Sequence, residues 1–290
     1  MGGVFSINFK VDWDPRSVGY REPMESTHEN LANLIRENKG NICIITGAGI
    51  SAHVLPTFRS SDAKGLWDVV ADKSLDKFQF YSQPDVSWKL WASIRDLQKQ
   101  KFLYPSKAHR VIHYLVKYGY VDTLLTQNID SLHSFKGDES KIIELHGKVT
   151  EFGECEKCNR KTPVDHLKVL QSGKCPKCPV CSSNLRPTVA FFQDLIPKDL
   201  RQKATKICQN TDLLILIGTH CVVDPVVTLV AEAFQSGATV VEINPDETRI
   251  SDKCDMKFYE KADEALVAVG KILFPDVDFG AKTNVEPIIQ

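Results

Sequence analysis

The chain has 290 residues, of which 42% are hydrophobic and 25% are charged, and its formal net charge is -1. This length is enough for one large α/β domain or for two units that share an interface. A protein that binds nucleic acid mainly through phosphates is expected to carry a basic excess, so the balanced charge speaks against direct nucleic-acid binding. No apolar run approaches the roughly 18 residues that a membrane-spanning helix needs.

Residues 1–25 show no clear hydrophobic period and are interpreted as an N-terminal arm. The arm has no apolar segment typical of secretion, and its acidic residues argue against a mitochondrial presequence. Gly2 followed by Ser6 fits the short acceptor pattern for N-myristoylation, so weak membrane anchoring is one alternative. We expect the protein in the cytoplasm, the nucleus or both.

The first regular elements are a helix followed by a buried strand. A helix is predicted over residues 26–37, where a serine and a threonine can cap it and apolar side chains share one face. Residues 41–45 form a short run rich in β-branched side chains, and Gly47 and Gly49 follow it directly. This pattern indicates a buried strand that runs into a glycine turn.

Residues 60–104 differ in character, since they are rich in tryptophan, phenylalanine and tyrosine at helical spacing. They are interpreted as a helical insertion with an aromatic interior. The elements predicted after it are a helix at 108–118, strands at 121–126, 141–145 and 188–192, a helix at 198–209, a strand at 212–217, a helix at 225–236, a strand at 238–243 and a helix at 262–273. Strands that alternate with helices in this way predict an α/β fold with a doubly wound parallel sheet.

Unusual polar residues follow the predicted strands. They lie at 47–51, at 127–130, at His146, at 218–220 and at Asn244. In a doubly wound sheet, ligands bind in the crevice beyond the carboxyl ends of the strands. The convergence of these segments predicts a nucleotide site there.

The glycine turn at residues 47–52 has the GxGxxA spacing of a dinucleotide-binding turn after a strand. Alone the match is weak, and a tight strand-to-loop turn explains it equally well. The acidic residue that dehydrogenases usually carry about 20 residues later is missing. An ordinary dehydrogenase therefore fits poorly.

Five of the nine cysteines lie between residues 155 and 181. Cys155-x2-Cys158 and Cys178-x2-Cys181 have the spacing of a zinc ribbon, in which four thiolates give a closed, structural site. Cys175-x2-Cys178 is also an acceptable pair, and spacing alone does not choose between the two registers.

His146 stands at the end of a predicted strand and is a candidate catalytic residue, although a single histidine is more often structural. Asn128 and Asp130 are candidate site residues, or else a capped turn. A metal site made of other histidines is a further alternative. No pair of them has HExxH spacing, so this alternative is discounted. The histidines of that alternative are His109, His113, His133 and His220.

Taken together, these segments resemble the sirtuin family from about residue 26 to residue 273. The segments that carry the resemblance, in the family's order, are Gly47-Ala-Gly-Ile-Ser51, Pro56-Thr-Phe-Arg59, Thr126-Gln-Asn-Ile-Asp130, Leu145-His-Gly147, the paired CxxC, Leu185-Arg-Pro187, Gly218-Thr219, Pro225 and Ile243-Asn244. The resemblance also implies the zinc register, because the family's second pair closely precedes the Leu-Arg-Pro segment, as Cys178 and Cys181 do.

The resemblance implies a Rossmann-like domain and a smaller lobe that combines the helical insertion with a zinc-ribbon module. The implied boundaries are an N-terminal arm at 1–25, a Rossmann-like NAD-binding domain at 26–60, 105–149 and 187–275, a helical insertion at 61–104, a zinc module at 150–186 and a C-terminal tail at 276–290.

The activity implied by the resemblance is NAD-dependent removal of an acyl group from a lysine of a protein, a histone for example. The acyl oxygen would attack the ribose of NAD, nicotinamide would leave, and His146 would act as base on a ribose hydroxyl. The implied catalytic residues are His146, Asn128 and Asp130. The implied cofactor-binding residues are Gly47, Ala48, Ser51, Thr57, Phe58, Arg59, Gln127, Asn128, Asp130, Gly218, Thr219, His220, Asn244 and Tyr259. The implied zinc ligands are Cys155, Cys158, Cys178 and Cys181.

The substrate peptide is expected to add as a strand between residues 189–192 and residues 222–223. Gln193-Asp194 stands where the family usually has a glycine and a glutamate, and the loop at 52–56 is one residue shorter than usual. Trp91 and Ile94 correspond to the tyrosine and arginine with which one branch of the family reads succinyl and malonyl groups. We therefore expect an acetyl or longer apolar acyl pocket, although Arg95 is adjacent.

Two other classes of function compete with this one. The first is a zinc-ribbon binding module without chemistry, which the charge balance disfavours. The second uses the same NAD site for protein mono-ADP-ribosylation or NAD hydrolysis, and it predicts nicotinamide release that does not depend on an acylated peptide.

Overall fold

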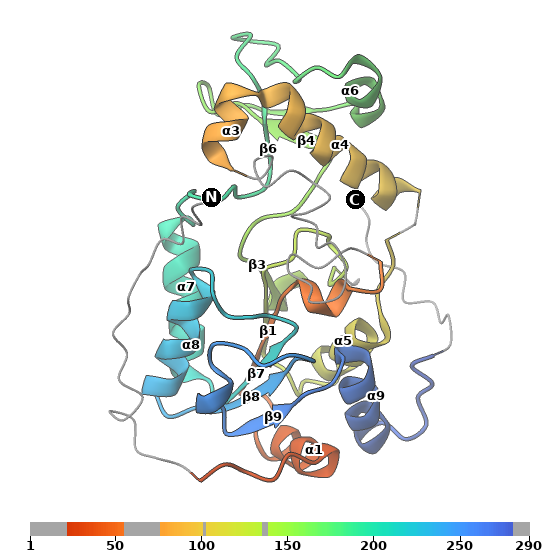
Figure 1. Cartoon of the computed structure of the whole chain (residues 1–290), viewed down its shortest axis with the longest axis vertical. Helices are drawn as coiled ribbons and strands as arrows, with labels where there is room; N and C mark the ends of the chain where they lie inside the picture. Colours follow the sequence, from red (N-terminus) through yellow and green to blue (C-terminus); the bar gives the residue numbers. More distant parts are fainter. Residues whose placement is uncertain (1–21, 55–75, 101–102, 135–138, 281–290) are drawn as a thin grey trace, which may run out of the picture.

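Six parallel strands form a single sheet in the larger of two lobes, in the order β3-β2-β1-β7-β8-β9 (Figure 1). The structure is a computed structural model that describes residues 22–54, 76–100, 103–134 and 139–280. The strands are β1 (Ile42–Thr46), β2 (Thr123–Thr126), β3 (Ile142–Glu144), β7 (Leu213–Ile217), β8 (Thr239–Ile243) and β9 (Met256–Phe258).

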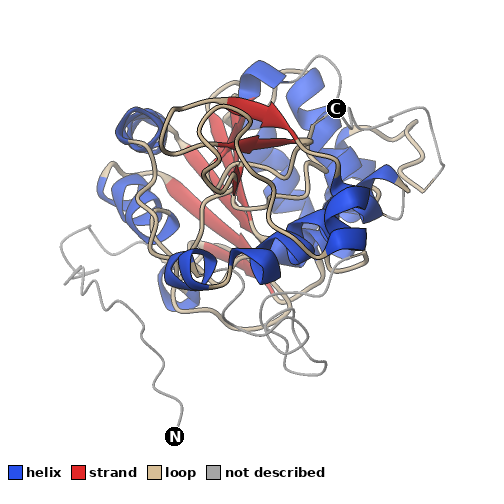
Figure 2. Cartoon of the chain, turned by 90° about the horizontal axis from the view of Figure 1, so that it is seen from above, coloured by secondary structure: helices blue, strands red, loops and turns tan. Residues whose placement is uncertain are grey.

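Helices cover both faces of this sheet, as the view from above shows (Figure 2). The helices of one face are α1 (His28–Glu37), α5 (Lys107–Lys117) and α9 (Ala262–Leu273), and those of the other are α7 (Lys198–Asn210) and α8 (Val226–Gln235). Strand β1 shows the alternation that this requires: Ile42 and Ile44 pack in the first layer, whereas Cys43 and Ile45 pack in the second. All five residues of β7 are buried, as expected of a strand covered on both faces.

The parallel, doubly wound sheet is confirmed, and five of its strands lie where they were predicted. Strand β9 was not predicted, because three residues at a sheet edge carry too little pattern. The strand expected at 188–192 is wrong. This segment crosses between the lobes, and its ends form isolated bridges to different partners, Val189 to Gly147 and Phe192 to Asp76.

The smaller lobe joins two segments that are far apart in the sequence. Its elements are helices α3 (Lys77–Ser82), α4 (Pro84–Lys99) and α6 (His166–Ser172), and a three-stranded sheet of β4 (Phe152–Glu154), β5 (Lys161–Pro163) and β6 (Arg186–Pro187). Trp88 and Trp91 of α4 share one apolar cluster with Leu185 and three cysteines. The Trp88 Nε1 donates to the Leu185 carbonyl at 2.6 Å. The insertion and the cysteine segment thus form one lobe, as expected.

In the part of the chain that the structure describes, no helix is both long and apolar enough to cross a membrane. The N-terminal arm up to residue 21 and the tail from residue 281 lie outside the described residues.

Candidate active site

The turns that follow β1 and β7 pack backbone against backbone. Gly49 N donates to Gly218 O at 2.9 Å, and Gly218 has a φ of 61°. A Cβ on Gly49 would lie 2.7 Å from the Gly218 Cα, and one on Gly218 would lie 2.6 Å from Ile50 N. Glycine is required at both positions, because any side chain would separate the two turns. The turn over Ala48–Ser51 therefore presents bare backbone at the carboxyl edge of the sheet, as close approach of a pyrophosphate demands.

A buried polar cluster lies beside this turn. Ser51 Oγ donates to Asp130 Oδ2 at 2.7 Å, and Asn128 Nδ2 donates to Ser51 Oγ at 3.3 Å. Burial raises the pKa of the Asp130 carboxyl, while hydrogen bonds from Leu132 N and Ser51 oppose this. The segments after β1 and β2 thus bring three candidate residues, Ser51, Asn128 and Asp130, into one hydrogen-bonded group.

His146 is fixed by a main-chain contact. Its Nδ1 lies 3.1 Å from the Gln127 carbonyl oxygen, which can only accept, so Nδ1 carries the proton and Nε2 is left as the base. Burial lowers the pKa of His146 below its usual value, against the opposing effects of that hydrogen bond and of Asp224. The imidazole is therefore neutral at physiological pH, as a general base must be.

A second group of candidate residues follows β7 and β8 at the same edge of the sheet. Gln127 Nε2 donates to Thr219 Oγ1 at 2.7 Å. Because the Gln127 carbonyl also contacts His146, Gln127 links this group to His146. Asn244 follows β8 and is 5% exposed, and its Nδ2 has no partner among the described residues. A buried amide without a partner fits a site completed by a polar ligand. His220 is half-buried, and Tyr259 is 55% exposed.

Three predicted cofactor-binding residues, Thr57, Phe58 and Arg59, lie outside the described residues. The roles assigned to individual cofactor-binding and catalytic residues remain predictions. What the structure adds is that the described candidates meet at one edge of the sheet.

Two sets of supporting contacts escaped the sequence analysis. Thr46 Oγ1 bonds both Thr126 Oγ1 and His133 Nε2, each at 2.9 Å, and so ties β1 to the loop after β2. Gln98 Nε2 of α4 donates to the Asp130 carbonyl at 3.1 Å. For the contacts of Thr46, the only signal in the sequence was that Thr46 and Thr126 are the last residues of their strands. Nothing in the sequence pairs Gln98 with Asp130.

The four predicted zinc ligands form one cluster. The sulfurs of Cys155, Cys158, Cys178 and Cys181 all lie within 4.8 Å of one another, with pairs at 3.4 Å and 3.5 Å. Tetrahedral zinc with Zn–S bonds of about 2.3 Å places sulfurs roughly 3.8 Å apart, so the donor set fits a structural Zn2+. Cys175 is buried outside this group and donates to main-chain carbonyls, and burial raises the pKa of its thiol to about 12. This geometry fits the register that the resemblance implies.

Comparison with known proteins agrees with the geometry. The family model described as the Sir2 family matches residues 47–225. The chain belongs to the Sir2 family. It is 35% identical over 240 residues to NAD-dependent protein deacylase 1 of Archaeoglobus fulgidus, a match that covers 82% of this chain and 94% of that protein. It is 32% identical to the NAD-dependent protein deacetylase of Thermotoga maritima, over 79% of this chain and 92% of that protein.

Solved Sir2 structures resemble the whole fold. A Sir2 complex with a p53 peptide and NAD+ has a TM-score of 0.73 and 28% identity, and the match covers 85% of this chain and 98% of that one. A Sir2 bound to a propionylated peptide has a TM-score of 0.71 and 29% identity, over 86% of this chain and 98% of that one.

Proposed function

We propose that this chain removes apolar acyl groups from lysine side chains of proteins, with NAD as cosubstrate. As a member of the Sir2 family it is an NAD-dependent protein deacylase, so the expected fold, cofactors and class of enzyme are confirmed. The curated relatives are named deacylases and deacetylases, which favours deacylation over the alternative of ADP-ribosyl transfer or NAD hydrolysis. The acyl preference is the new element of the proposal.

The observation that carries this preference is the state of Arg95. Its side chain is 4% exposed, and its Nη2 forms an ion pair with Glu151 Oε2 at 2.9 Å. Its Nη1 donates to Gln98 Oε1 at 3.3 Å. A buried guanidinium that already neutralises a carboxylate is held in place, because breaking such a pair leaves an uncompensated charge. Arg95 therefore serves as a structural tie and not as a reader of an acidic acyl group.

The neighbouring side chains are apolar. Trp91 is 3% exposed and Ile94 is 9% exposed, and both belong to the small-lobe core. These positions correspond to the tyrosine and arginine of the acid-reading branch. With neither group present, the carboxylate of a succinyl chain would be desolvated without a partner, which disfavours its binding.

In the reaction, NAD would supply an electrophilic ribose carbon, held by the glycine turn and the buried polar cluster. Asp130 and Asn128 are already oriented by Ser51, so little reordering is needed on binding. His146, with its proton fixed on Nδ1 by Gln127, accepts a hydroxyl proton at Nε2.

The test combines purified protein, NAD and a panel of acetyl-, propionyl-, longer alkanoyl- and succinyl-lysine peptides. Acyl loss coupled to nicotinamide release is expected for the alkanoyl peptides, with kcat/KM at least about tenfold lower for succinyl. A preference for succinyl would overturn the apolar pocket. Nicotinamide release that ignores the peptide would favour ADP-ribosyl transfer or hydrolysis.

Replacement of His146 tests the base. His146→Ala is expected to lower kcat/KM by about 10²–10⁴-fold, since general-base catalysis contributes that much. His113→Ala, on α5, serves as the matched histidine control and should retain activity. Equal loss in both variants would remove the special role of His146.

The protein partners and the location are part of the proposal. A histone is one substrate to include in the panel. None of the nine cysteines is in a disulfide, which supports the proposal of a reducing compartment such as the cytoplasm or nucleus. Gly2 lies outside the described residues, and mass spectrometry of protein from cells would reveal a myristoyl group.

A further inference from the structure

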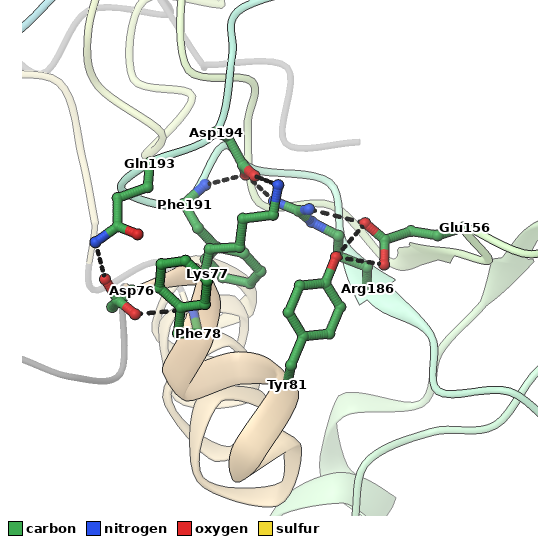
Figure 3. Close-up of polar contacts among 9 residues, drawn as sticks. All are labelled: Asp76, Lys77, Phe78, Tyr81, Glu156, Arg186, Phe191, Gln193 and Asp194. Carbon is green, nitrogen blue, oxygen red and sulfur yellow. Dashed lines mark hydrogen bonds and ion pairs between the residues drawn. The ribbon is translucent and has the colours of Figure 1, made fainter.

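The segment at 189–194 ends in a cluster of polar contacts. We call it the groove segment, because the substrate peptide is expected to pair with its residues 189–192. Its last two residues, Gln193 and Asp194, are the pair that departs from the usual family pattern. Gln193 has a φ of 72°, so it keeps the left-handed conformation that suits glycine while adding a side chain. That side chain is used: Gln193 Nε2 donates to Asp76 Oδ2 at 2.8 Å (Figure 3).

Asp194 gathers three donors in this cluster of polar contacts. It accepts from Phe191 N at 2.7 Å and from Arg186 Nη2, and it pairs with Lys77 Nζ at 3.4 Å (Figure 3). Its side chain is 10% exposed, so these interactions are poorly screened by water. Lys77 also donates its main-chain N–H to the Phe192 carbonyl at 3.3 Å. The first turn of α3 therefore holds the groove segment by both a side chain and a main chain.

The contacts continue into the zinc module. Arg186 Nη1 pairs with Glu156 Oε1 at 2.9 Å, and Tyr81 of α3 donates to the same carboxylate. Glu156 directly follows the zinc ligand Cys155. Figure 3 shows Arg186 between Asp194 and Glu156, with Tyr81 against the Glu156 carboxylate.

The other end of the groove segment is tied to the catalytic base. Ala190 N donates to the His146 carbonyl at 2.9 Å, and Val189 bridges Gly147. The groove segment is not a regular strand, so a ladder does not fix its course. It is held instead at His146 on one side and, on the other, by the contacts that Lys77, Arg186 and Asp76 make with its last residues.

We propose that Lys77 and Asp194 are positioning residues that set the affinity for the acylated peptide and leave the chemistry of His146 unchanged. The inference rests on the proposed function, since it takes the groove segment as the peptide's partner. Loss of the pair removes one of the charged contacts that hold the end of the segment. The looser segment must then be ordered by the peptide on binding, at a cost in affinity. No residue of the buried polar cluster around Ser51 and Asp130 takes part in these contacts.

The test measures binding apart from turnover. Fluorescence anisotropy of a labelled acyl-lysine peptide gives its Kd without NAD, and steady-state kinetics give the two KM values and kcat. For Lys77→Met and Asp194→Asn, the peptide Kd and KM are expected to rise about tenfold. KM for NAD and kcat should stay within about twofold. Lys77→Arg, which keeps the charge, should restore most of the affinity.

Lys174→Met is the matched control, because Lys174 pairs with Asp85 at 3.0 Å in the same lobe but takes no part in the polar contacts of the groove segment. It should leave every constant unchanged. Lys77 is a third exposed, so its variant is expected to fold, and a thermal unfolding curve checks this.

The outcomes separate the two proposals. The positioning role alone would be overturned if the wild-type protein binds and deacylates the peptide and both variants, Lys77→Met and Asp194→Asn, have the same peptide Kd and KM. A fall in kcat with unchanged peptide Kd would also overturn it. Wild-type protein that neither binds nor deacylates any peptide would defeat the proposed function first.

Discussion

The two lobes are stabilised in different ways. The large lobe buries β1 and β7 completely between two layers of helices, and its ligand edge is built from main-chain contacts and side-chain hydrogen bonds. The small lobe has strands of two or three residues, and it depends on a cysteine cluster and on ion pairs such as Arg95–Glu151 and Arg186–Glu156. A unit this small cannot bury enough apolar surface, so metal and side-chain links take over.

We propose that the two lobes have separate tasks. The buried, hydrogen-bonded edge of the large lobe would hold NAD, which is the same in every turnover. The small lobe contributes Trp91, Ile94 and Lys77, which we propose to govern the acyl chain and the peptide. Substrate choice can therefore change in the small lobe without disturbing the NAD edge.

The strongest test of this contrast is removal of zinc. Structural zinc contributes on the order of 10 kcal/mol to the folding of a small module. A strong chelator or Cys178→Ser should unfold the small lobe while the six-stranded sheet persists. Hydrogen exchange would show rapid labelling of β4 and α6 and continued protection of β1 and β7.

Cys175→Ser is the matched control, since Cys175 is buried but lies outside the cluster. It should retain one zinc per chain by metal analysis. Cys178 belongs to both registers, so Cys181→Ser completes the test. Zinc loss in Cys175→Ser and retention in Cys181→Ser would mean that the other register is correct.

Two glycines, one in each lobe, allow the packing around the backbone to be compared. Gly218 of the large lobe and Gly173 of the small lobe have φ values of 61° and 64°. A Cβ at Gly218 meets Ile50 N at 2.6 Å, whereas one at Gly173 meets nothing within 4 Å. Gly173→Ala should cost only the left-handed conformation, about 1 kcal/mol. Gly218→Ala adds a clash and should cost about 3 kcal/mol in all.

Chemical denaturation gives both free energies of unfolding. NAD affinity should fall in Gly218→Ala alone, because its turn packs against the glycine turn. Equal destabilisation by the two variants would contradict the close packing of the two turns.

The smallest expected effect is a pH dependence of the large lobe. Burial lowers the pKa of His133 from its usual 6.5 to about 3. The unfolded chain therefore binds a proton below pH 6.5 that the folded chain refuses until about pH 3. Stability is fully present above pH 6.5 and falls as the pH drops, by about 2 kcal/mol between pH 6.5 and 5.

Denaturation curves at several pH values measure this slope. His133→Gln, whose amide does not titrate, should make the slope shallower. An unchanged slope in that variant would assign the acid sensitivity to other groups, among them the buried His109, whose pKa is also lowered by burial.

Much of the fold followed from patterns along the chain. Runs such as 212–217 are apolar enough to require burial on both faces, and their alternation with helices predicted a parallel sheet. The convergence of Gly47, Asn128 and His146 followed in turn, because carboxyl ends of parallel strands lie at one edge. The resemblance to a known family added the zinc register and the prediction that His146 is the base.

What the sequence by itself determined is therefore most of the helices and strands of the large lobe, the kind of sheet, the edge at which the candidate residues meet and the cysteine set, since each depends on local periodicity or spacing. Only the tertiary structure decided that Arg95 is paired with Glu151, that Gln98 reaches the Asp130 carbonyl and that Lys77 holds Asp194. These contacts join residues 32 to 117 positions apart. Charged and amide side chains have many suitable partners along a chain, and only the packing of the two lobes selects one.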